Sequence, residues 1–190
     1  MTYPLSILKE DINKLPRYKF NGPVILIESA KDALSAINDL KKERVLGFDS
    51  ETRPSFSKGE SYPVSLLQLA TNTKAYLFRL NKFPLALELG DIFANPNIVK
   101  AGVGVRDDIN ALQKLHPFTF NNFVELAELA KQNKIENFSL RALTAILLQK
   151  RLSKKSKISN WARQELTDAQ ISYAACDAVV AFEIYHALVQ

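Results

Sequence analysis

The sequence predicts an α/β fold, because segments typical of β-strands alternate along the chain with segments typical of helices. Five short, mainly apolar runs have the pattern of buried strands, at residues 24–27, 45–51, 64–70, 75–80 and 98–102. The chain has 190 residues, 47% of them hydrophobic, which is enough for one sizeable domain with a full core. We expect residues 1–22 to form an N-terminal lead-in with a short helix, and residues 23–190 to form this domain.

The first half of the chain has the pattern of an antiparallel meander. Strand 24–27 precedes a helix over 30–42, for which Ser29 is the expected N-cap. Strands 64–70 and 75–80 are separated by four turn-forming residues, which is a hairpin signal. Together with strand 45–51 they predict the meander. Loop 53–61 leaves strand 45–51 beside two carboxylates, and we expect a plain surface loop there rather than a substrate contact.

The second half is mainly helical. Helices are expected over 84–94, from residue 105, over 123–131, over 139–149 and from 167 toward 188. The last of these begins with a capping box, in which Thr167 is the N-cap and Gln170 stands three positions later. Nine residues of this helix, 174–182, are apolar apart from Asp177. A helix that is apolar on all sides is buried, so we expect this helix in the core.

The composition restricts the classes of partner and compartment. Lys and Arg number 25 against 20 Asp and Glu, and the net charge of +5 permits nucleic acid or other anionic partners. Cys176 is the single cysteine, so an intramolecular disulfide is excluded and a reducing compartment fits. One Cys and two His argue against a structural zinc site. We found neither an apolar run of transmembrane length nor a signal-peptide pattern, and we expect a cytoplasmic protein without a membrane partner.

Two carboxylates stand at the end of strand 45–51. Asp49 and Glu51 are two residues apart, so they project from the same face of the strand. Two like charges held together raise the cost of ionising each other, and a divalent cation bound through oxygens offsets that cost. The alternative is a strand that runs out into solvent with two hydrated acids at its edge.

Two further carboxylates fall on faces that should be buried. Asp108 lies on the apolar stripe of the helix from residue 105, whereas Asp107 lies on its other side. A cap or a salt bridge near the helix start is the alternative role for Asp108. Asp177 is costly in a buried helix unless it is paired or binds a metal. Tyr173, four residues earlier, lies on the same face as Asp177.

These four acids suggest one chemistry. The sequence shows no obvious lysine or arginine partner for them, and an all-oxygen ligand set suits two Mg²⁺ or Mn²⁺ ions. Two such ions, about 3.5–4 Å apart, clamp a phosphodiester during in-line displacement by water. We therefore expect a metal-dependent phosphodiesterase with Tyr173 orienting the attacking water. The expected metal ligands are Asp49, Glu51, Asp108 and Asp177.

Three other features have mainly structural explanations. Gly102-Val103-Gly104 begins like a dinucleotide fingerprint, but Asp107 stands at the third glycine position and the match fails. Trp161 is expected to be a packing anchor rather than a platform for base stacking. The third is a basic segment that contains Lys150, Arg151, Lys154, Lys155 and Lys157. It can be a solvated loop or a non-specific contact to a phosphate backbone.

Three motifs in this order resemble the DEDD superfamily of 3′–5′ exonucleases, tyrosine subclass (DEDDy), the group of RNase D and the exonuclease domain of the Werner syndrome protein. They lie at residues 48–51, 102–108 and 173–177, with secondary matches at 67–69, 122–126 and 159–161. The resemblance covers about residues 24–189. It implies an RNase H-like fold, in which helices flank a mixed five-stranded sheet.

The resemblance also implies roles for the site residues. Asp49, Glu51 and Asp177 would bind the metal that carries the nucleophilic water, and Asp49 with Asp108 would bind the second. Tyr173 takes the place of the histidine of the sister subclass. The family's spacing selects Asp108 rather than Asp107 as the ligand. Ser50 is a small departure, because threonine or isoleucine is frequent at its position.

The implied activity is two-metal-ion hydrolysis of DNA or RNA from the 3′ end, with release of nucleoside 5′-monophosphates. Two alternatives remain open at this point. One is a nucleic-acid-binding or assembly module with weak catalysis, and the other is an RNA-trimming enzyme like RNase D. No motif identifies a protein partner.

Overall fold

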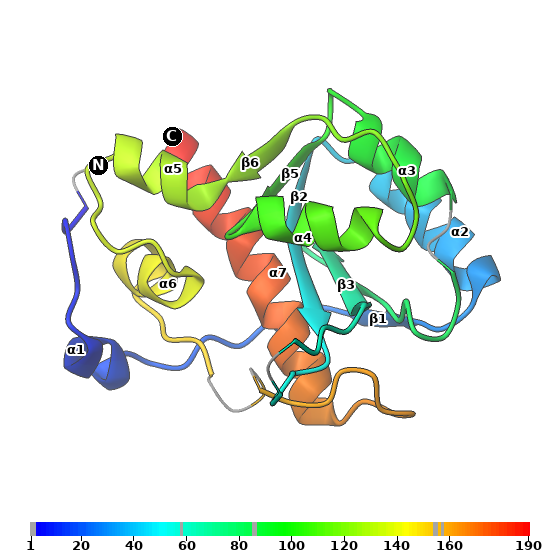
Figure 1. Cartoon of the computed structure of the whole chain (residues 1–190). Coiled ribbons are helices and arrows are strands. Elements are labelled where there is room, and N and C mark those ends of the chain that lie inside the picture. Colours follow the sequence, from blue (N-terminus) through cyan, green and yellow to red (C-terminus); the bar gives the residue numbers. More distant parts are fainter. Residues whose placement is uncertain (1–2, 58, 85–86, 154–155, 157) are drawn as a thin grey trace.

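The computed structural model describes residues 3–57, 59–84, 87–153, 156 and 158–190 (Figure 1). The strands are β1 (Val24–Ile27), β2 (Val45–Thr52), β3 (Val64–Ala70), β4 (Ala75–Phe78), β5 (Val99–Gly102) and β6 (Phe123–Glu125). The helices are α1 (Lys9–Lys14), α2 (Ala30–Leu40), α3 (Leu87–Ala94), α4 (Val105–Gln113), α5 (Leu126–Gln132), α6 (Leu140–Leu148) and α7 (Asp168–Val189). The predicted α/β class is confirmed.

The strands form one mixed sheet in the order β1-β4-β3-β2-β5-β6. The pairs β2–β3 and β3–β4 are antiparallel, so the predicted meander is confirmed. The strands β1, β5 and β6 each join a neighbour in parallel. Every residue of β3 is buried, because β3 lies in the middle of the sheet with both faces covered.

The sheet has six strands, and the prediction of five was wrong. Residues 123–125, expected as the first turn of a helix, instead form β6 and pair with β5. Helix α5 begins only at Leu126, and the side chain of Glu125 caps it by accepting a hydrogen bond from the amide of Ala127 at 3.2 Å. Three residues are too few to show a strand period in the sequence. Their conformation depends on pairing with β5, which is a tertiary contact.

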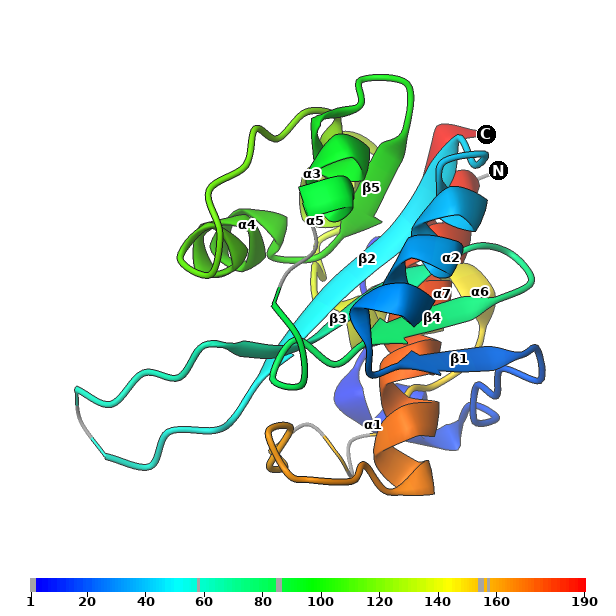
Figure 2. The same cartoon turned by 90° about the vertical axis from the view of Figure 1, so that its right-hand side faces the viewer.

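Helices cover both faces of the sheet (Figures 1 and 2). One core contains apolar side chains of α2, α3 and α4 against Leu46 and Phe48 of β2. On the other face, α7 packs across the strands together with α5 and α6. Residues of β2 alternate between these two cores, so odd-numbered residues from Gly47 onward face α7.

Gly47 allows α7 to lie directly on β2. A Cβ atom added at Gly47 would lie 1.9 Å from the carbonyl oxygen of Ala178 and 2.8 Å from the amide nitrogen of Phe182. The capping box predicted at Thr167 and Gln170 starts α7. This helix is long and apolar enough to cross a membrane by length and composition, but 56% of its apolar window is buried inside the fold. It is the core helix that the sequence predicted.

The N-terminal lead-in runs along α6 and α7. The hydroxyl of Tyr18 donates to Glu183 Oε1 at 2.7 Å, and that of Tyr3 to the carbonyl of Ala187 at 3.1 Å. Ile12 of α1 packs against Ala142 and Ala145 of α6. The short helix expected in this segment is α1. Residues 3–22 therefore support the helical side of the domain.

The loop between β2 and β3 projects from the body of the molecule (Figure 2). Phe56 in this loop is 85% exposed. The guanidinium of Arg53 lies 4.5 Å from the centre of the Tyr62 ring, where the two ends of the loop meet. This cation–π contact fixes the base of the loop beside Glu51.

Candidate active site

Asp49 and Glu51 lie where β2 extends beyond one of its neighbours. Among the residues that the structure describes, strand β2 pairs with β5 only from Val45 to Gly47, whereas its pairing with β3 continues to Thr52. One edge of β2 is therefore open beside the two carboxylates. Both side chains project toward α7, because they share the face of Gly47.

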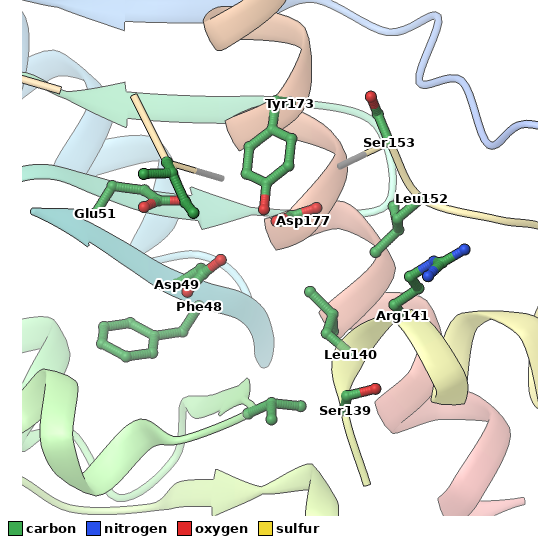
Figure 3. A pocket seen from close by; sticks show the side chains of 12 residues that line it. Phe48, Asp49, Glu51, Ser139, Leu140, Arg141, Leu152, Ser153, Tyr173 and Asp177 are labelled. Atoms are coloured by element: carbon green, nitrogen blue, oxygen red, sulfur yellow. The ribbon is translucent and has the colours of Figure 1, made fainter. Parts of the chain in front are cut away.

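Helix α7 brings Tyr173 and Asp177 to the same place. These residues are four positions apart, hence on one face of the helix. One carboxylate oxygen from each of Asp49, Glu51 and Asp177 lies within 4.8 Å of the other two. Figure 3 shows these three acids gathered below the ring of Tyr173. The structure thus brings together three of the four predicted metal ligands and the predicted tyrosine.

Asp108 approaches from α4 on the other side of β2. Ser50 faces away from α7, and its hydroxyl donates a hydrogen bond to Asp108 Oδ1 at 2.6 Å. Asp107 is exposed, as the helix phase predicted, and Asp108 is half-buried. The carboxylate of Asp108 is not one of the three clustered acids, but its charge acts on Asp49. Asp108 therefore lies beside the cluster rather than within it.

Burial and mutual repulsion control the charges of these acids. Desolvation, followed by the charges of Asp177, Asp108 and Glu51, raises the pKa of Asp49 well above its usual value. Desolvation raises the pKa of Asp108 to about 6, and the hydrogen bond from Ser50 opposes this shift. Holding all these carboxylates ionised therefore requires compensating positive charge.

A pocket of about 770 Å³ opens in front of the acids. Figure 3 shows Asp49, Glu51, Tyr173 and Asp177 along one side, with Leu140 and Arg141 of α6 across from them. Much of the remaining surface of the pocket is lined by the apolar side chains of Phe48, Val103, Leu140, Leu152 and Ile158. The pocket thus combines a cluster of acidic groups with a largely apolar surface.

Comparison with protein-family models matches residues 24–190 to the 3′–5′ exonuclease domain. The chain belongs to the 3′–5′ exonuclease family. It is 32% identical over 195 residues to the mouse bifunctional 3′–5′ exonuclease/ATP-dependent helicase WRN, covering 96% of this chain and 14% of that protein. The family predicted from the motifs is confirmed.

Solved structures show the same fold. The EXO domain of Nibbler from Aedes aegypti superimposes with a TM-score of 0.81 at 27% identity, covering 90% of both chains. RNase D of Escherichia coli has a TM-score of 0.78 at 17% identity, covering 86% of this chain and 44% of that one. The RNase H-like fold is therefore confirmed. The chain spans between 14% and 41% of the length of the first curated relatives that it matches.

Glu125 is a site residue that sequence reasoning missed in this exonuclease domain. Its Oε2 accepts hydrogen bonds from the amides of Gly104 at 2.8 Å and Val105 at 3.0 Å. Gly104 precedes α4 with a φ of 79°, which favours glycine. The carboxylate occupies the anion-binding start of α4, the place that a phosphate takes in a dinucleotide-binding turn. Glu125 fixes the turn that presents Asp108.

The basic segment is only partly described. The Nε atom of Arg151 donates to the carbonyl of Leu15 at 2.9 Å, and the amide of Arg151 donates to the carbonyl of Pro16 at 3.0 Å. This arginine thus binds the N-terminal segment, whereas Lys150 is exposed. The other predicted nucleic-acid contacts, Lys154, Lys155 and Lys157, lie outside the described residues.

Trp161 packs behind Tyr173, the tyrosine of the third motif. It is fully buried among Leu66, Leu77 and Ala174, as a packing anchor should be. Its ring centre lies 6.0 Å from that of Tyr173. The buried Arg79 donates to the carbonyl of Arg163 at 2.5 Å and so holds the segment that carries Trp161. These contacts restrict the position of Tyr173.

Proposed function

We propose that this chain hydrolyses DNA or RNA from the 3′ end and releases nucleoside 5′-monophosphates, as a member of the tyrosine subclass. The observation that carries the proposal is the cluster of Asp49, Glu51 and Asp177, whose oxygens lie within 4.8 Å beside Tyr173. Family membership supports the reaction class.

The donor set fits two hard divalent cations, Mg²⁺ or Mn²⁺. The clustered ligands are all carboxylate oxygens, which these ions prefer. Asp49, Glu51 and Asp177 would hold one ion, and Asp49 with Asp108 the other. When bound, the two ions supply an activated water and stabilise the leaving oxyanion. The raised pKa of Asp49 supports this assignment, because burial and the charges of the neighbouring acids raise it, and a divalent cation at the cluster would stabilise the ionised form.

Tyr173 is proposed to orient the attacking water. Burial, together with the charges of Asp177 and Glu51, raises the pKa of its hydroxyl above the usual value, so the group stays protonated at neutral pH. A protonated phenol can donate one hydrogen bond and accept another, and can therefore hold a water in one orientation. Trp161 behind the ring keeps the hydroxyl in place.

The test compares two labelled substrates, a duplex with a recessed 3′ end and a single-stranded RNA. Each is incubated with the protein in Mg²⁺, Mn²⁺ or EDTA. We expect a metal-dependent ladder that shortens from the 3′ end, and its absence for Asp49→Ala and Asp177→Ala. The matched control is Asp91→Ala, which removes an exposed acid that pairs with Lys41 on the surface. Full activity of either active-site variant would refute the proposed mechanism.

The same assay separates the alternatives. Preferred degradation of the RNA would identify an RNA-trimming enzyme, and preferred degradation of the duplex a DNA exonuclease. Binding of both substrates without cleavage in either metal would indicate a binding or assembly module. We also propose a cytoplasmic location, supported by the single cysteine, Cys176, which is buried and unpaired.

A further inference from the structure

The described lining of the active-site pocket contains one cationic side chain, Arg141. The same lining contains three acids, Asp49, Glu51 and Asp177. Under the proposed function, metal ions would compensate these acids at the scissile phosphate, but a nucleic acid strand carries a further charge at each linkage. The next phosphate along the strand therefore needs a cationic partner on another wall of the pocket.

Arg141 is positioned rather than free to move. Its Nη2 atom donates to Asn13 Oδ1 at 2.6 Å, which joins α6 to α1. Helix α1 itself is anchored, because Ile12 packs on Ala142 and Ala145 of α6. Holding the guanidinium in advance lowers the entropy lost when it binds an anion.

Arg141 also retains unused donors. Among the described residues its guanidinium donates a hydrogen bond only from Nη2, to Asn13; Nε has no partner but is shielded from solvent, so the donors left for a ligand are on the terminal nitrogens. Within the same part of the chain, the guanidinium forms no ion pair with an acid. In Figure 3 it lies on the α6 side of the pocket and away from the three carboxylates. A half-buried arginine with open donors beside a pocket for a polyanion is suited to a phosphate.

We propose that Arg141 binds the phosphodiester linkage next to the scissile one, and that Asn13 is its positioning residue. This inference rests on the proposed function and specifies how the site holds the strand. It assigns a role to the N-terminal segment, whose α1 supports the substrate-binding wall. A purely structural role, in which Arg141 only joins α6 to α1, would affect stability but not discrimination between substrates.

The test uses Arg141→Gln with Arg44→Gln as the charge-matched control. Arg44 is exposed and directly precedes β2, at the end of that strand opposite to Glu51. On a single-stranded substrate in Mg²⁺, we expect Arg141→Gln to raise KM about tenfold, the loss of a charged hydrogen bond, with kcat changed less than about twofold. The salt dependence of log Kd should fall by roughly 0.7. Arg44→Gln should change none of these values.

A second oligonucleotide identifies the linkage. It carries an uncharged methylphosphonate next to the scissile position, and its binding is measured in EDTA so that nothing is cleaved. If the proposal is correct, wild type loses affinity for this oligonucleotide and Arg141→Gln binds it as well as wild type does. An equal loss for Arg141→Gln on both oligonucleotides would overturn the inference, as would equal behaviour of Arg141→Gln and Arg44→Gln.

Two further variants, and the activity of wild type itself, separate failure of this inference from failure of the proposed function. Arg141→Lys keeps the charge but loses the guanidinium fork, so it should raise KM by less than Arg141→Gln does, with kcat unchanged; if Arg141→Gln fails to fold, an unchanged KM for Arg141→Lys would overturn the inference. Asn13→Ala should raise KM by less than Arg141→Gln, and adding it to Arg141→Gln should have no further effect. If wild type degrades no nucleic acid, the proposed function fails. If wild type is active and Arg141→Gln equals it, only this inference fails.

Discussion

The hydroxyl of Ser50 lies 2.6 Å from Asp108 Oδ1 and joins β2 to the first turn of α4. The amide of Ser50 also donates to Asp49 Oδ1 at 2.9 Å. One residue between the two acids of β2 thus orients two proposed metal ligands on opposite sides of the strand. This contact is formed by the serine that departs from the family's frequent threonine or isoleucine.

Replacing Ser50 by alanine should weaken metal binding without removing a ligand. The hydrogen bond from Ser50 lowers the pKa of Asp108, so its loss should raise that pKa and shift the acidic limb of the pH–activity profile upward. Loss of such an outer contact typically costs about 10-fold or more in metal affinity. The measurement is activity as a function of Mg²⁺ concentration and pH, with Ser55→Ala in the exposed loop as control. An unchanged Mg²⁺ dependence would contradict this role.

Asp49→Asn should stabilise the metal-free protein while abolishing activity. The neutral amide removes a charge that is desolvated and repelled by Asp177, Asp108 and Glu51. Each kcal/mol gained raises the melting temperature of a domain of this size by roughly 3 °C. Thermal unfolding in EDTA measures this gain, and added Mg²⁺ should stabilise wild type more than the variant. A lower melting temperature for Asp49→Asn in EDTA would show that the repulsion is not a significant cost.

The raised pKa of Asp108 should make the free energy of unfolding depend on pH. Its folded-state pKa of about 6 lies above the ordinary 3.8, so the folded protein holds the proton more tightly than the unfolded chain. Between these values the unfolded state releases its proton first, and the free energy of unfolding must fall as pH rises. The stability of metal-free wild type relative to Asp108→Asn should therefore fall from about pH 4 to pH 7. Urea unfolding across this range tests the sign.

Gly47→Ala should separate α7 from β2. The new Cβ would lie 1.9 Å from the carbonyl oxygen of Ala178, next to Asp177, so the helix must move. We expect a loss of about 3 kcal/mol or more and a larger loss of activity. The control is Gly90→Ala in α3, where the new Cβ meets its nearest atom at 3.8 Å and helix propensity favours alanine. Unfolding and nuclease assays on both variants check this; equal stabilities would show that α7 does not need the glycine.

Tyr173→Phe should slow hydrolysis less than the loss of a carboxylate ligand. The variant keeps the ring that packs on Trp161 but loses the hydroxyl near Asp177. A single water-orienting hydrogen bond contributes about 10²-fold, whereas metal binding should persist. Single-turnover rates and Mg²⁺ titrations of Tyr173→Phe and Asp177→Ala test the difference. A wild-type rate for Tyr173→Phe would exclude the proposed role.

Some features followed from the sequence because their causes are local. The capping box of α7 depends on Thr167 and Gln170, which are three residues apart. The shared face of Asp49 and Glu51 follows from the two-residue period of a strand, and that of Tyr173 and Asp177 from the helical period. A lone acid in an apolar helix predicted a site because burying it alone is costly.

The other features required the tertiary structure, because they depend on which distant segments meet. Strand β6 exists only through pairing with β5, and Glu125 reaches the amide of Gly104 from 21 positions away. The need for glycine at position 47 becomes clear only when α7 is seen to pack directly against it. The position of Arg141 likewise depends on its hydrogen bond to Asn13, which is 128 residues earlier. The motifs that indicate the family, and the faces of the strand and helices on which the acids lie, could be predicted from the sequence, since each depends on residues a few positions apart. The folded chain decided the open edge of β2 and the wall that faces the acids, since packing joins residues that no local pattern connects.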